Sequence, residues 1–191
     1  YYTGLFFAYN PHMKPLPYIH DSITVTESMC DHNGHMNVNH YYKLFDSTYT
    51  SFYINELGFD EEYIKSGFST FTLEDSIRYL NEFTLDEKVY PSFILYRANK
   101  KLLHFIGILQ NENAELAAIF ETVLGHIDLK KRKIVNFSDD KVQHTQEICK
   151  KQNEVKFLDH IKTIIDTNST NAEAIMAQYQ KDKNFFNINE K

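Results

Sequence analysis

The chain has 191 residues and a formal net charge of −6 at pH 7. Its hydrophobic content of 42% and charged content of 24% are ordinary for a soluble globular protein, and its length suits one domain with a sizeable core. The acidic balance argues against nucleic acid as the main partner, since nucleic-acid binders concentrate basic residues on one face. No stretch is apolar over the length that a membrane span needs.

The chain opens on an extended lead-in, predicted over residues 1–20, which hold three of the four prolines. A short strand is predicted over residues 22–27, where Ile23 and Val25 alternate with polar residues. A polar loop rich in turn-forming residues follows over residues 31–35. A long helix is expected after this loop.

Apolar and aromatic residues recur at helical spacing from Asn37 to Leu57, and Gly58 follows as a C-cap. Since this apolar face is broad, we expect the helix to be buried. The period then changes to two, which indicates strands. The predicted strands cover residues 71–83, 89–98, 102–110 and 115–127. Their short connections predict an antiparallel meander.

The segment after the last predicted strand is helical in character, with apolar spacing over residues 139–151 and 154–166 and more weakly over 171–183. The element order predicts an α+β domain in which one sheet wraps around one helix. We therefore divide the chain into a domain over residues 1–136 and a helical tail over 137–191. The tail is expected to pack on the domain or on a partner subunit.

The polar loop before the long helix is the best candidate for chemistry. A helix start presents free N–H groups and a partial positive charge, which can polarise a carbonyl and hold an oxyanion. Asp31 stands just upstream, where it can act as a nucleophile or as a general base. Gly34 permits a close backbone approach there. In the alternative reading, Asp31 and Asn33 only cap the helix.

Other kinds of site find little support in the sequence. His32, His35 and His40 lack the spacing of metal ligands on one helical face, so no metal is predicted. Cys30 and Cys149 stand far apart, which favours a reducing compartment and a cytoplasmic protein. The basic run over residues 130–133 indicates a solvated turn, with contact to the phosphates of a nucleotide-like ligand as the alternative.

The loop carries a resemblance to a known family. The motif Asp31-x-Asn33-Gly34-His35-Met36-Asn37, with Tyr41 beyond it, resembles the signature of hot-dog acyl-CoA thioesterases of the 4-hydroxybenzoyl-CoA thioesterase type. Three further blocks are similar to that group: Glu74 to Glu82, Lys100 to Phe105, and Ala117 to His126. The likeness covers about residues 23–128. It implies the hot-dog fold, an antiparallel curved sheet around one long buried helix, with extra C-terminal helices here.

The resemblance also implies the site residues. The catalytic positions are Asp31, as the carboxylate, and Val38, whose backbone N–H polarises the carbonyl. The implied substrate-binding positions are Asn33, Gly34, His35, Asn37, Tyr41, Glu74 and Ser76. The chain departs from the family pattern at Val38 in place of a second Asn, at Ser76 where His is frequent, and at Lys101 where Arg is usual.

The function implied by the resemblance is hydrolysis of a small acyl-CoA, with coenzyme A as part of the substrate and no cofactor. Within that group the sequence resembles betainyl-CoA thioesterases, which suggests an acyl group with a quaternary ammonium. The many Tyr and Phe residues could supply an aromatic box to bind it, and the alternative is that they form the core. We expect a homodimer or homotetramer in which a partner strand near residues 71–76 closes the site, and no nucleic-acid or membrane partner. The alternatives are a non-catalytic acyl-CoA-binding hot-dog protein and a hot-dog dehydratase.

Overall fold

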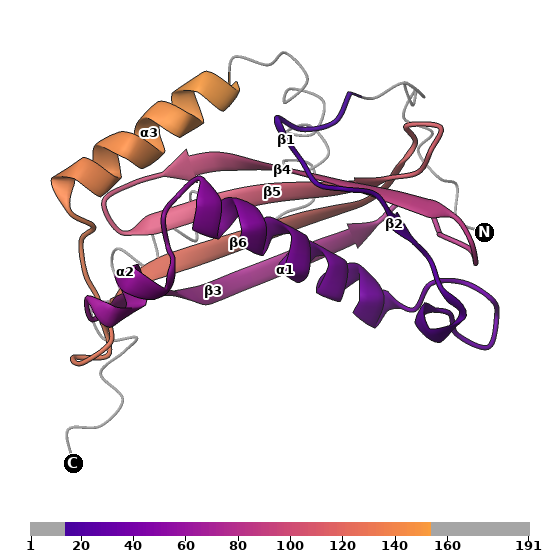
Figure 1. Ribbon diagram of the computed structural model, residues 1–191, viewed down its shortest axis with the longest axis horizontal. Coiled ribbons are helices and arrows are strands. Elements are labelled where there is room, and N and C mark those ends of the chain that lie inside the picture. The colour runs from indigo at the N-terminus through magenta and orange to yellow at the C-terminus, as the bar shows by residue number, and fades with distance from the viewer. Residues whose placement is uncertain (1–13, 154–191) are drawn as a thin grey trace, which may run out of the picture.

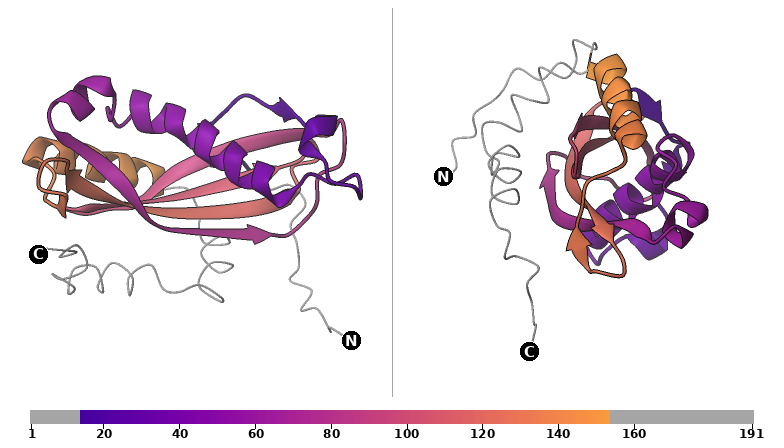
Figure 2. Two further views of the ribbon diagram at one scale, coloured as in Figure 1. Left: turned by 90° about the horizontal axis from the view of Figure 1, so that it is seen from below. Right: turned by 90° about the vertical axis from the view of Figure 1, so that its left-hand side faces the viewer.

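The computed structural model describes residues 14–153, which form an antiparallel sheet with a long helix across one face (Figure 1). The elements in chain order are β1 (Tyr18–Ile19), β2 (Ile23–Thr24), the 3-10 helix η1 (Glu27–Met29), α1 (Val38–Asn55), α2 (Glu61–Lys65), β3 (Phe68–Tyr79), β4 (Lys88–Ala98), β5 (Leu102–Gln110), β6 (Leu116–Asp128), β7 (Lys133–Ile134) and α3 (Asp139–Asn153). Figure 2 shows α1 lying along the face of the sheet. This confirms the predicted α+β hot-dog fold.

The long helix and the last three long strands lie where the hydrophobic periods predict them. The short strand predicted over residues 22–27 is wrong in extent, because β2 covers two residues and the chain turns into η1 after Val25, which still bonds to the backbone of residues 86 and 87. The short helix α2 was not predicted from the sequence. It is held by the Asp60 side chain, which accepts a hydrogen bond from the Tyr63 N–H at 2.9 Å.

The predicted four-strand meander is wrong at its first connection. The strand order is β1-β4-β5-β6-β3, so β3 pairs with β6 and lies at the sheet edge farthest from β4. The reason lies in residues 80–87, which leave the sheet after Tyr79 and bond to the start of α1. Phe83 is fully buried there and its carbonyl accepts the Met36 N–H at 2.8 Å. The chain therefore crosses below the helix start before β4 begins.

Aromatic packing explains why α1 lies close against the sheet. Phe45 stacks on Phe120 of β6, with ring centroids 4.9 Å apart, and meets Phe93 of β4 edge-on at 6.2 Å. A Cβ atom added to Gly107 of β5 would come within 2.5 Å of the Phe93 ring and 3.1 Å of Phe45. Glycine is therefore needed under the helix, because any larger residue would push these rings away.

The first predicted tail helix is present as α3, which packs at the β4 edge of the sheet. Cys149 belongs to the apolar cluster of Phe52 and Phe105, and Gln152 Oε1 accepts the Leu95 N–H at 2.9 Å. The other two predicted tail helices lie outside the described residues, and the domain boundary at residue 136 stays a prediction. Within residues 14–153, no helix has the length and apolar character required to cross a bilayer.

Candidate active site

The Asp31 carboxylate closes a tight loop just before α1. Its Oδ1 atom accepts the N–H of Asn33 at 2.8 Å and that of His35 at 3.4 Å. Two backbone hydrogen bonds also close the loop: the Asp31 N–H donates to the His35 carbonyl at 2.9 Å, and the Gly34 N–H donates to the Asp31 carbonyl at 3.0 Å. No described residue donates a hydrogen bond to Oδ2 of Asp31. One carboxylate oxygen is thus held in place while the other is available to a reactant.

Gly34 is needed for its conformation. Its φ angle is +81°, in the left-handed region that L-residues rarely adopt. An added Cβ would meet nothing within 4 Å, so the predicted role of Gly34 in a close backbone approach is not what requires glycine within this chain. The positive φ lets the chain reverse between Asp31 and His35.

The helix start beside this loop keeps one N–H group free. Asn37 is the N-cap of α1, and its Oδ1 accepts the N–H of Asn39 at 3.0 Å, while the His40 N–H bonds to the Asn37 carbonyl at 2.9 Å. The Val38 N–H has no acceptor among the described residues. The alternative in which Asp31 and Asn33 cap the helix is therefore wrong, because Asn37 fills that position. The Val38 N–H is therefore available to an acceptor on a ligand.

The loop is fixed against the segment that follows β3. His35 Nδ1 lies 3.2 Å from Glu82 Oε2, and the His35 backbone forms a β-bridge with Thr84. The buried Tyr41 hydroxyl accepts the Phe83 N–H at 3.1 Å and donates to the Asn81 carbonyl at 3.4 Å. The predicted residues His35 and Tyr41 thus position the loop, the helix start and the crossover segment together.

A hollow of about 410 Å³ lies beside the start of α1. Its walls come from the loop, from the first turn of the helix and from the end of β3. The lining residues are His35, Met36, Val38, Tyr41, Tyr79, Leu80, Asn81 and Glu82. The Tyr79 ring meets the Tyr41 ring edge-on at 5.2 Å, and both Tyr79 and Leu80 are about half exposed. This hollow can take a small group attached to a carbonyl at the Val38 N–H.

The charges of the site follow from these contacts. The Asn33 N–H, which donates to the carboxylate, is the main cause that lowers the pKa of Asp31 below its ordinary 3.8, so Asp31 is ionised at neutral pH. Burial raises the pKa of Tyr41, and the nearby charges of Glu82 and Glu87 raise it further. Asp31 is therefore a ready nucleophile or base, and Tyr41 stays a neutral phenol.

Two predicted substrate-binding residues lie elsewhere within this chain. Asp75 accepts a hydrogen bond from Tyr42 of α1 at 3.0 Å, so strand alternation places Glu74 and Ser76 on the opposite face of the sheet. Burial and the charge of Glu121 raise the pKa of Glu74 there. The structure therefore does not bring Glu74 or Ser76 to the Asp31 loop.

Sequence reasoning missed the wall formed by Tyr79, Leu80 and Glu82. The strand was predicted to continue to residue 83, which hid the point where the chain leaves the sheet after Tyr79. Tyr79 is the last residue of β3, on the face of the sheet that α1 covers, and Leu80 and Glu82 follow it where the chain crosses to the start of α1.

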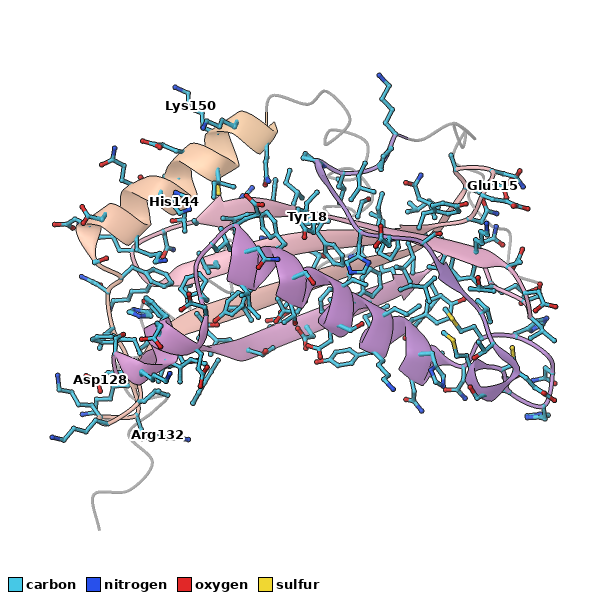
Figure 3. The ribbon with its side chains drawn as sticks, in the orientation of Figure 1. Tyr18, Glu115, Asp128, Arg132, His144 and Lys150 are labelled. Atoms are coloured by element: carbon cyan, nitrogen blue, oxygen red, sulfur yellow. The ribbon has the colours of Figure 1, made fainter. Side chains whose placement is uncertain are left out.

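A metal site and the basic run over residues 130–133 were the other candidates considered from the sequence. The described residues contain no group of three His, Cys, Asp or Glu side chains that could hold a metal ion, and Cys30 and Cys149 are free thiols. Figure 3 places Asp128 and Arg132 at the end of the sheet remote from the start of α1. Lys131 pairs there with Asp128 at 3.2 Å, and Arg132 lies over the Phe71 ring. Within one chain, this basic turn does not reach the Asp31 loop.

Curated relatives are similar to more than half of this chain. The sequence is 30% identical over 112 residues to the L-carnitine dehydrogenase/betainyl-CoA thioesterase of Rhizobium meliloti (strain 1021), which covers 58% of this chain and 22% of the relative. It is 32% identical over 103 residues to the protein of the same name from Ruegeria pomeroyi, covering 54% and 21%. The chain thus spans about a fifth of the length of these relatives.

Solved structures and a family model agree on the fold. A hypothetical protein of Staphylococcus aureus in complex with CoA superposes with a TM-score of 0.66 at 26% identity, covering 71% of this chain and 85% of that one. The DHNA-CoA thioesterase of the same organism gives a TM-score of 0.62 at 20% identity, covering 72% and 93%, which supports the fold alone. The model of the thioesterase-like superfamily matches residues 25–147. This chain therefore belongs to the thioesterase-like superfamily.

Proposed function

We infer that the chain hydrolyses the thioester of a small acyl-CoA at the Asp31 loop. The observation that carries this proposal is the pairing of an ionised carboxylate, whose Oδ2 is unbonded among the described residues, with the free Val38 N–H at the start of α1. A carboxylate and an N–H donor at a helix start are the groups that acyl transfer to water needs. The family membership and the names of the relatives support the same chemistry.

The proposed reaction uses the two groups in turn. The Val38 N–H donates to the thioester carbonyl oxygen and stabilises the negative charge that develops on it. Asp31 either attacks the carbonyl carbon or takes a proton from a water that attacks it. If water attacks, the C–S bond breaks to give the carboxylic acid, and the leaving thiolate takes the proton that Asp31 accepted from the water. If Asp31 attacks, the C–S bond breaks to leave a mixed anhydride on Asp31 and the coenzyme A thiolate, which is protonated by water, and a water then hydrolyses the anhydride to the acid and free Asp31. No metal or cofactor enters this scheme.

The acyl group is proposed to be small and to resemble a betainyl group. The relatives from Rhizobium meliloti and Ruegeria pomeroyi carry betainyl-CoA thioesterase in their names. The hollow beside Val38 has aromatic walls and a carboxylate, which suits a compact cationic group better than an anionic one. The cytoplasmic location stays a prediction.

The test is the release of free thiol from a panel of acyl-CoAs, with short neutral, branched and quaternary ammonium acyl groups. Thiol release from a small acyl-CoA is the expected result. Binding of acyl-CoA without turnover would support a non-catalytic acyl-CoA-binding protein instead. Hydration or dehydration of a hydroxyacyl-CoA or enoyl-CoA, without thiol release, would support a hot-dog dehydratase.

The pH profile tests the charge state of Asp31. Since its pKa is lowered below 3.8, the carboxylate is ionised and competent above that value and is lost only as the pH falls through the lowered pKa. The ordinary pKa of aspartate is about 4, so we expect kcat/KM to fall only below about pH 4. Circular dichroism at each pH checks that the protein is still folded. A limb between about pH 6 and 7 would instead point to a histidine as the base.

The edge strand β3 bears on how copies of the chain associate. The strand β3 is long, ends the strand order and pairs only with β6 among the described strands, so it is an edge strand along which another strand can add. We propose that a second copy pairs along this edge and closes the open side of the hollow. Light scattering at micromolar concentration should give twice, or four times, the 22.5 kDa of one chain. A fully active monomer would contradict this arrangement.

A further inference from the structure

The hollow beside Val38 is lined by aromatic and acidic side chains. Two tyrosine rings, Tyr41 and Tyr79, form its aromatic part, and Glu82 stands at its rim. Of the described residues that line it, none is lysine or arginine. A group that enters this hollow therefore meets π-faces and negative charge.

The structure holds these groups in place before any ligand arrives. The Tyr41 ring is buried, and its hydroxyl is tied to the backbone of residues 81–83 by two hydrogen bonds. Its edge-on contact with Tyr79, at 5.2 Å, sets the position of the exposed ring. His35 Nδ1 lies 3.2 Å from one oxygen of Glu82 and so holds this carboxylate beside the rings.

Negative charge lies beside the aromatic rings. Glu82 lines the hollow, and the charges of Glu82 and Glu87 both act on the Tyr41 hydroxyl, where they add to the effect of burial in raising its pKa. An anionic acyl group would be repelled from these two carboxylates, whereas a cation would be attracted.

We propose that Tyr79 and Glu82 select acyl-CoAs whose acyl group carries a quaternary ammonium, with the cation seated against the Tyr79 ring. A quaternary ammonium has no N–H to donate, so an aromatic face and a nearby carboxylate are the groups that can recognise it. This inference rests on the proposed thioesterase function and names the residues that decide its acyl specificity. Tyr79 is expected to matter more than Glu82, because an exposed carboxylate is screened by water and salt.

The test compares two substrates of the same shape. Betainyl-CoA carries a trimethylammonium group, and 3,3-dimethylbutyryl-CoA carries a tert-butyl group in its place, so the two acyl groups have the same shape and differ in charge. The cation also makes the neighbouring carbonyl more reactive, so each kcat/KM is divided by the rate of uncatalysed hydrolysis of the same thioester, and the quantity compared is the ratio of these corrected values. For the unaltered protein we expect this ratio to favour the cation by about tenfold or more.

The variants separate the ring from the charge. Tyr79→Leu should lower the ratio about fivefold and Tyr79→Phe should preserve it, since phenylalanine keeps the π-face. Glu82→Gln should lower it about twofold to threefold, and by less at high salt. Turnover of the neutral substrate is the reference in each variant, because any loss that a change in the wall of the hollow causes for both substrates cancels in the ratio.

Matched controls lie away from the hollow. Tyr90→Leu removes a ring and Glu112→Gln removes a charge beside a different, smaller hollow near the β5–β6 turn, and both should leave the ratio unchanged. A ratio within about twofold of one in the unaltered protein, or one that survives both Tyr79→Leu and Glu82→Gln, would overturn the specificity inference while the thioesterase function stands. Release of thiol from no acyl-CoA at all would remove the proposed function, and the inference with it.

Discussion

Replacing Asp31 with asparagine is expected to lower kcat on the best acyl-CoA substrate by about a hundredfold or more, the usual loss for a general base or nucleophile. The amide has no negative charge, so it can neither attack the carbonyl efficiently nor take a proton from water. Its oxygen can still accept the N–H groups of Asn33 and His35, which Asp31 Oδ1 binds at 2.8 and 3.4 Å. The loop and the KM should therefore change little, and the loss should appear in kcat.

Asp60→Asn is the matched control for this substitution. Asp60 also accepts a backbone N–H, that of Tyr63 at 2.9 Å, and it caps the short helix α2. Its replacement tests what an Asp-to-Asn change does to a turn without touching the Asp31 loop, and activity should stay within about twofold. Turnover of Asp31→Asn within about threefold of the unaltered protein would remove Asp31 from the mechanism.

The sequence predicts where the helices and strands lie along the chain better than it predicts which strands pair in the sheet. The periods of 3.6 and two locate α1 and β4 to β6 within a few residues. Strand pairing depends instead on where the chain crosses the helix. That crossing is set by Phe83 and by the Tyr41 hydroxyl, which are forty-two residues apart along the chain. Local patterns therefore could not exclude the meander.

The same limit applies to the site. Asp31, Gly34 and Asn37 are neighbours in sequence, so a motif can show them together, and the structure explains each by a hydrogen bond or a φ angle. The wall of the hollow comes from a distant segment: Tyr79 ends β3 on the face that α1 covers, and Leu80 and Glu82 follow where the chain leaves the sheet. Glu74 shows the opposite case, since alternation along β3 turns its side chain to the other face of the sheet.

The free N–H at Val38 can be removed without unfolding the helix. Val38 is the first residue of α1, a position where proline is well tolerated, and its side chain is 55% exposed. The preceding residue, Asn37, has φ −64° and ψ 142°, the extended conformation that a following proline requires. Val38→Pro therefore deletes one N–H group and leaves the cap of Asn37 on Asn39 intact.

Val38→Pro is expected to lower kcat about a hundredfold, a typical loss for one oxyanion donor, with a melting temperature close to that of the unaltered protein. Val38→Ala is the control, since it shortens the side chain but keeps the N–H, and it should retain kcat within about threefold. The neighbouring donors cannot substitute for the lost group, because the Asn39 N–H is bonded to Asn37 Oδ1 and the His40 N–H to the Asn37 carbonyl. If Val38→Pro turns over substrate as fast as Val38→Ala, the carbonyl is polarised by another group, and the start of α1 serves only to position the loop.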